Sequence, residues 1–154
     1  MSSHPLNVRY VHTNIVARDW KALAAFYVEV FGCRPKPPER NLEGPWLDGL
    51  TGLTGAHIRG MHLTLPGWGD HGPTLEIFQY DANLENPAKR IHTEGFGHIA
   101  FAVDDVEACL ALVASHGGSA LGTIVRSEIA GVGSLHVVYA KDPEGNIVEL
   151  QKWE

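Results

Sequence analysis

Val8 to Val16 is predicted to form a β-strand, in which successive side chains point to opposite faces. Thr13 and Ile15 fall on one face of this strand, and His12 and Asn14 fall on the other. The strand therefore has one polar face that begins with a histidine.

Two later segments repeat apolar residues at helical spacing, and each follows an aspartate. Asp19 precedes WKALAAFYVEVF, which is followed by Gly32. Asp105, or its neighbour Asp104, precedes VEACLALVASH, which is followed by Gly117 and Gly118. Aspartate is a favoured N-cap and glycine a favoured C-terminal stop, so both segments are predicted to be amphipathic helices.

The strand and the helix cap together occur twice. GHIAFAVDD in the second half aligns with VHTNIVARD in the first. His98 then corresponds to His12 and Asp105 to Asp19, and both pairs are separated by 86 residues. Each half also contains an apolar strand with a single acid, Glu76 in TLEIF and Glu149 in IVEL. The chain is therefore predicted to be a duplication.

Further strands are predicted at His57–Leu65, near 122–126 and at Leu135–Ala140. Cys33–Ala56 is rich in proline and glycine, so little regular structure is expected there. Asp81–Gly95 is polar and is predicted to be a linker.

This order predicts an α+β fold of two β-α-β-β-β modules within one domain. The first module spans residues 1–80, the linker 81–95 and the second module 96–154. A chain of 154 residues with 44% hydrophobic composition is large enough to form such a core.

Composition excludes several classes of function. A net charge of −6 with 12 Lys and Arg argues against a nucleic-acid surface. The N-terminus lacks the blocks of a signal peptide, and no apolar run is long enough for a membrane span. Two distant cysteines give no disulfide framework. These features predict a cytoplasmic protein that binds neither nucleic acid nor membranes and acts on a small molecule.

The duplicated residues His12, Glu76, His98 and Glu149 are the candidate metal ligands. Two imidazoles and two carboxylates suit Zn, Ni, Co, Fe or Mn, and they leave positions open for a substrate. A lone strand histidine is usually a core or surface residue, whereas an acid within an apolar strand needs a partner.

Three further histidines, His57, His62 and His136, lie in predicted strands. Each could line the metal site or occupy a core or surface position. The core or surface position is favoured, because no histidine stands at the equivalent position in the other half of the chain. No Ser-His-Asp order or phosphate-binding glycine loop is evident.

At GHIAFAVDD, AFYVEVFG and DPEGNIVEL, the sequence resembles the vicinal oxygen chelate superfamily, which includes glyoxalase I, bleomycin resistance proteins and extradiol dioxygenases. The resemblance implies sheets that form an open barrel around one divalent metal ion. By position it assigns the ligands to His12, Glu76, His98 and Glu149, a set similar to that of bacterial glyoxalase I. A methylmalonyl-CoA epimerase pattern would have Gln in place of Glu76.

The resemblance implies a metal-dependent lyase or isomerase, of glyoxalase I or epimerase type. It would enolise a small substrate with vicinal oxygens through an enediolate, with Glu149 or Glu76 moving the proton. The alternatives are an extradiol-type dioxygenase and a non-catalytic binding or antibiotic resistance protein. Asn14, Trp46 and Phe78 are candidates for substrate contacts.

The segment GPWLDGLTGLTG departs from compact glyoxalases and, with GPTLEIFQY, is similar to a branch that contains cyclitol epimerases. No basic cluster for the carboxylates of glutathione is evident in the sequence. An open barrel leaves sheet edges exposed, so a homodimer is expected. The resemblance to glyoxalase I favours ligands that converge across its interface.

Overall fold

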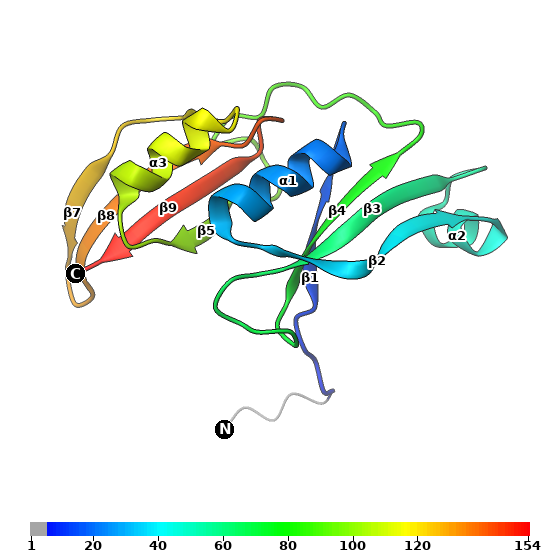
Figure 1. Ribbon diagram of the computed structural model, residues 1–154, viewed down its shortest axis with the longest axis horizontal. Helices are drawn as coiled ribbons and strands as arrows, with labels where there is room; N and C mark the ends of the chain where they lie inside the picture. The colour runs from blue at the N-terminus through cyan, green and yellow to red at the C-terminus, as the bar shows by residue number, and fades with distance from the viewer. Residues whose placement is uncertain (1–5) are drawn as a thin grey trace.

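The computed structural model describes residues 6–154, which form two β-sheets with two long helices along one side (Figure 1). The first sheet has the strand order β1-β4-β3-β2, and the second has the order β5-β9-β8-β6, with β7 also paired to β8. The helices are α1 (Trp20–Phe31), α2 (Pro45–Thr51) and α3 (Val106–Ser115). The strands are β1 (His12–Val16), β2 (Arg34–Glu43), β3 (His57–Thr64), β4 (Thr74–Tyr80), β5 (Ile99–Ala102), β6 (Ser119–Ala120), β7 (Val125–Ile129), β8 (Gly133–Lys141) and β9 (Ile147–Trp153).

The duplication is visible in the pairing of the strands. β1 pairs in parallel with β4, and β5 pairs in parallel with β9, whereas the other pairs are antiparallel. Within residues 6–154 no strand pair joins the two sheets, so they do not close into a barrel. The predicted α+β class with an open arrangement of sheets is confirmed.

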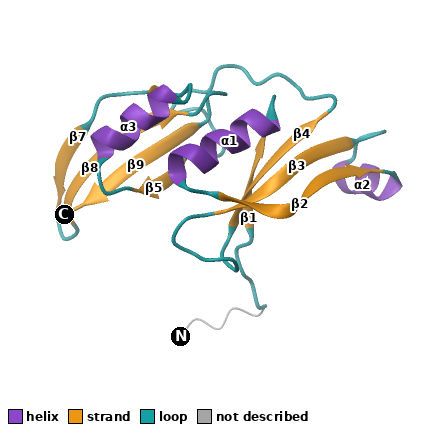
Figure 2. Ribbon diagram, in the orientation of Figure 1, coloured by secondary structure: helices purple, strands orange, loops and turns teal. Residues whose placement is uncertain are grey.

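Both predicted helix caps are present. The carboxylate of Asp19 accepts a hydrogen bond from the backbone N–H of Ala22, and that of Asp105 accepts one from Ala108. Gly32 ends α1 in the left-handed conformation with φ of 70°. Figure 2 shows α1 and α3 on the same side of the sheets, and the two helices are in contact.

The expectation of little regular structure in Cys33–Ala56 is wrong, because this segment contains β2 and α2. β2 lies at the edge of its sheet, where prolines that lack an N–H are tolerated, and its pairing with β3 is interrupted between Lys36 and Arg40. α2 begins with Pro45 in its first turn and ends at Gly52 with φ of 73°. Proline and glycine thus delimit a helix here instead of preventing one.

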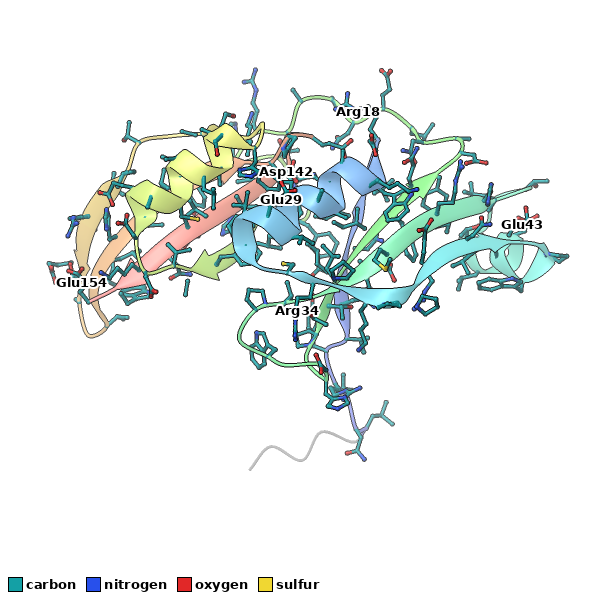
Figure 3. The ribbon with its side chains drawn as sticks, in the orientation of Figure 1. Arg18, Glu29, Arg34, Glu43, Asp142 and Glu154 are labelled. Carbon is teal, nitrogen blue, oxygen red and sulfur yellow. The ribbon has the colours of Figure 1, made fainter. Side chains whose placement is uncertain are left out.

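One hydrophobic core joins the two halves. Phe31 of α1 stacks on Phe101 of β5 with ring centroids 4.0 Å apart. The hydroxyl of Tyr27 donates a 2.8 Å hydrogen bond to Asp142, which lies beside α1 in Figure 3. Burial raises the pKa of Tyr27, and the charge of Asp142 raises it further. Asp142 also accepts hydrogen bonds from Asn146, so this turn of the second half is tied to the first helix.

Substitution of Tyr27 by Phe is expected to lower the free energy of unfolding by about 1–2 kcal/mol, because a buried carboxylate loses a donor. Urea denaturation of the wild type and the variant measures the difference. Tyr80→Phe is the matched control and is expected to change stability little. Equal effects of the two substitutions would contradict a special role for the contact between Tyr27 and Asp142.

None of the helices formed by residues 6–154 is long and apolar enough to cross a membrane.

Candidate metal centre

A row of polar residues crosses the first sheet from β1 to β2. Strand register places Asn14 beside Glu76, Glu76 beside His62, and His62 beside Lys36. Neighbouring residues in register point to the same face of a sheet. We call the face that carries this row the open face of the first sheet, because the opposite face packs against α1 through residues such as Leu75 and Ile77.

Glu76 is the centre of this row, and both its oxygens have polar partners. Its Oε1 accepts a 2.9 Å hydrogen bond from the amide of Asn14 and lies 3.6 Å from Nε2 of His12. Its Oε2 lies 2.8 Å from Nε2 of His62. Glu76 is only 9% exposed, so these contacts supply the partners that a buried carboxylate requires.

His62 is held by hydrogen bonds at both ring nitrogens. Its Nδ1 lies 2.8 Å from the hydroxyl of the buried Thr74. A carboxylate only accepts, so Nε2 of His62 donates to Glu76, and Thr74 then donates to Nδ1. Burial lowers the pKa of His62, Glu76 opposes this effect, and the positive charge of Arg40 lowers the pKa further. Through Nε2, His62 donates to Glu76 and helps to orient its carboxylate.

The second sheet has a corresponding pair. Nε2 of His98 lies 2.9 Å from Oε2 of Glu149. Tyr139 is beside Glu149 in register, the position that His62 occupies relative to Glu76. Burial raises the pKa of Tyr139, and the charge of Glu149 raises it further. The ring of Tyr139 lies 5.0 Å from that of His98.

The chain thus brings the four candidate ligands together as two pairs. The ligand atoms of His12, His62 and Glu76 lie within 4.8 Å of one another, and this is the one group of three or more His, Cys, Asp or Glu residues at that separation within residues 6–154. His98 and Glu149 belong to no such group in the same part of the chain.

The first cluster has the donors that a divalent cation needs. Imidazole nitrogen and carboxylate oxygen bind borderline metals at about 2.0–2.2 Å, so donors within 4.8 Å of one another need only small movements to share an ion. His12 is the freer imidazole, because its side chain is 39% exposed and its contact with Glu76 is long. His62 has both nitrogens engaged, which suits a residue that orients a ligand.

The candidate substrate residues lie at different distances along the open face. Asn14 contacts Glu76 directly. The ring of Phe78 lies 6.0 Å from that of His62. Phe78 also contacts Gly60 closely, because a Cβ added at Gly60 would lie 2.6 Å from the Phe78 ring and 2.1 Å from the carbonyl oxygen of Ile77. Trp46 belongs to α2 and is exposed, and α2 lies at the outer end of the first sheet (Figure 1).

His62 is the member of this cluster that was not assigned from the sequence. A signal was present, because His62 and Glu76 are equidistant from Gly69 in the turn between β3 and β4, which places them opposite each other in a hairpin. His57 instead contacts Asp81 and Asn41 near the surface. His136 is buried beneath α3, with Nε2 3.2 Å from a carboxylate oxygen of Glu107.

Known structures share this arrangement of sheets and helices. A glyoxalase family protein from Bacillus cereus superposes with a TM-score of 0.77 at 19% identity, over 99% of this chain and 98% of that protein. A glyoxalase family protein from Enterococcus faecalis gives a TM-score of 0.57 at 22% identity, over 94% and 96% of the two chains. At these identities the similarity concerns the fold.

Sequence relatives extend over nearly the same length. A probable lactoylglutathione lyase of Vibrio parahaemolyticus is 28% identical over 148 residues, which cover 94% of this chain and 90% of that protein. One from Vibrio cholerae is 28% identical over 154 residues, which cover 97% and 91%. The family model of the Glyoxalase/Bleomycin resistance protein/Dioxygenase superfamily matches residues 9–150. The chain therefore belongs to the glyoxalase, bleomycin resistance protein and dioxygenase superfamily.

Proposed function

We propose that the chain is a divalent-metal-dependent enolising enzyme, a lyase or isomerase of glyoxalase or epimerase type, whose site forms between two copies. The observation that carries the proposal is the division of the ligands into two pairs on separate sheets. His12 and Glu76 of one protomer would meet the partner's His98 and the partner's Glu149. Two ligands are too few to hold a borderline metal, and two such pairs make the usual four.

The surface near the first strand supports a dimer. Leu84 and Phe96 in the connection between the sheets are 95% and 94% exposed, and Tyr10, Val11 and Val16 around β1 are also exposed. β1 and β5 both lie at sheet edges. Exposed apolar side chains and unpaired strand edges are normally covered by another chain. A dimer with two-fold symmetry would bury the apolar side chains and the strand edges in one interface.

The chemistry follows from the donors. A divalent cation held by these residues would supply a Lewis acid and make a C–H beside a carbonyl more acidic. Glu149 or Glu76 removes the proton and returns it, to the opposite face in an epimerase or to the neighbouring carbon in a glyoxalase-type isomerase. Asn14 and His62 keep the carboxylate of Glu76 in one orientation during this transfer. The relatives named probable lactoylglutathione lyase support a lyase of this kind.

Solvent deuterium incorporation tests the reaction class. The metal-loaded protein, incubated in D₂O with a hydroxyketone, the hemithioacetal of methylglyoxal or a 2-methyl acyl thioester, is expected to place deuterium on the carbon beside the carbonyl of at least one of them. NMR or mass spectrometry of the recovered compound detects the label. Absence of exchange with all three, in protein that holds about one metal ion per chain, would count against the proposal.

A second candidate is an extradiol-type dioxygenase. Two histidines and one carboxylate are the ligand set of many non-haem iron oxygenases, and His12, His62 and Glu76 have this composition within one chain. In this second function, His62 would lose its hydrogen bond to Glu76 and bind the iron instead. Oxygen uptake by the iron-loaded protein with a catechol separates the two functions, because enolisation consumes no oxygen.

A further inference from the structure

A cavity of about 280 Å³ lies beside the cluster of His12, His62 and Glu76. Its wall includes His62 and Thr74, which are hydrogen-bonded to each other. An occupant of this cavity would contact His62, whose Nε2 lies 2.8 Å from Glu76. The polar and basic side chains that line the cavity are those of Arg9, Lys36, Arg40, His62, His71 and Thr74.

Strand register explains how two of the cations reach this place. Lys36 is opposite His62, and Arg40 is opposite Gly60, although the chain between them leaves the regular pairing. His62 and Gly60 are two residues apart on one strand and therefore point to the same face. Lys36 and Arg40 thus lie on the open face of the first sheet, and Arg9 joins them from the segment that precedes β1.

The positive charge of the cavity is not neutralised by the described part of the chain. None of the residues that line it is Asp or Glu, and no ion pair within residues 6–154 involves Arg9, Lys36 or Arg40. Lys36 donates a 3.1 Å hydrogen bond to the backbone oxygen of Asp70, and Arg40 donates one of 2.6 Å to that of Pro38. These neutral acceptors orient the cations without cancelling their charge.

A cluster of three unpaired cations is unexpected in a chain of net charge −6 with only 12 Lys and Arg. Like charges repel, so gathering them in one cavity is unfavourable unless an anion occupies it. Arginine and lysine are the usual partners of carboxylate and phosphate groups. The sequence does not show this cluster, because Arg9 lies far from Lys36 and Arg40 along the chain and joins them only in the fold.

We propose that the cavity lined by Arg9, Lys36 and Arg40 binds an anionic group of the substrate, a carboxylate or a phosphate, next to the part that reacts at Glu76. This proposal deepens the proposed function and rests on it for the identity of the reacting site. It assigns the substrate to a class: a small carbonyl compound with vicinal oxygens and one anionic group within a few bonds of them.

Matched hydroxamates test the proposal on the zinc-loaded protein. Acetohydroxamate presents two vicinal oxygens alone, malonohydroxamate adds a carboxylate, and phosphonoacetohydroxamate adds a phosphonate. Calorimetric titration is expected to show that one or both anionic compounds bind about tenfold to a hundredfold more tightly than acetohydroxamate, because each charge-assisted hydrogen bond contributes to affinity. The stronger of the two identifies the anion.

The double substitution Lys36→Gln with Arg40→Gln is expected to remove this advantage and to leave the affinity for acetohydroxamate unchanged. Arg126→Gln, in β7 of the other sheet, is the matched control and is expected to retain the advantage. Circular dichroism of each variant verifies that it is folded. Equal affinities of the wild type for all three hydroxamates would overturn the proposal, and so would an advantage that survives the double substitution.

Titration of the metal-free protein with inorganic phosphate separates the cavity from the metal centre. Saturable binding that shifts the NMR signals of His62 and is lost in the double variant supports the cavity, even when no hydroxamate binds. If none of the three hydroxamates binds the zinc-loaded protein but phosphate binds saturably, the proposed metal chemistry is contradicted and the anion site is not. Absence of saturable phosphate binding would overturn the anion site itself.

Discussion

A mixture of His12→Ala and Glu149→Ala chains is expected to recover activity that neither variant has alone. Each site would take His12 and Glu76 from one protomer and the partner's His98 and the partner's Glu149, so a mixed dimer contains one intact site and one site with two defects. Random exchange makes half of the dimers mixed, and the expected activity is about a quarter of that of the wild type.

The matched control mixes His12→Ala chains with Glu76→Ala chains. His12 and Glu76 would contribute to the same site from the same chain, and Nε2 of His12 lies 3.6 Å from Oε1 of Glu76. Every site in this mixed dimer would therefore lack one ligand, and no activity should return. Native mass spectrometry shows whether mixed dimers have formed. Lack of recovery in the first mixture, when mixed dimers are present, would contradict a site shared between chains.

Substitution of Glu149 by Gln is expected to lower kcat by about a thousandfold or more, because glutamine keeps the shape of the side chain but neither carries the proton nor balances the metal charge. Turnover and metal content of the purified variant measure the two effects. Glu128→Gln, on the exposed strand β7, is the control and is expected to retain wild-type activity.

The same variant distinguishes the enzyme from a binding or resistance protein that uses the fold without chemistry. A binding protein would show no turnover in the wild type, and its affinity for its ligand would depend little on Glu149. An unchanged kcat in Glu149→Gln would remove this residue from the proposed proton transfer and leave Glu76 as the candidate base.

Much of the scaffold could be predicted because it follows local rules. The aspartate caps of both helices, the glycine that ends α1 and the alternation in the strands around His12 and Glu76 are short-range patterns with direct physical causes. The pairing of each histidine with the acid of its own half followed from the repeat. In the fold, each of these histidines lies within 4 Å of the glutamate of its own half.

The features that were missed depend on register and on edges. β2 contains Pro35 and two further prolines, which argue against a strand unless the strand lies at an edge with an interrupted ladder. Two of the three cations near His62, Lys36 and Arg40, lie in β2, and the break in pairing between them decides which face they share; Arg9 reaches the same place from the segment before β1. A linear sequence contains no direct signal for such a break.

Anomalous X-ray scattering from crystals grown with cobalt or nickel would test the shared metal site most directly. We expect one metal peak per chain, bonded to His12 and Glu76 of one protomer and to the partner's His98 and the partner's Glu149, with His62 still hydrogen-bonded to Glu76. A peak bonded to His12, His62 and Glu76 of a single chain, with the partner's residues remote from it, would contradict this account.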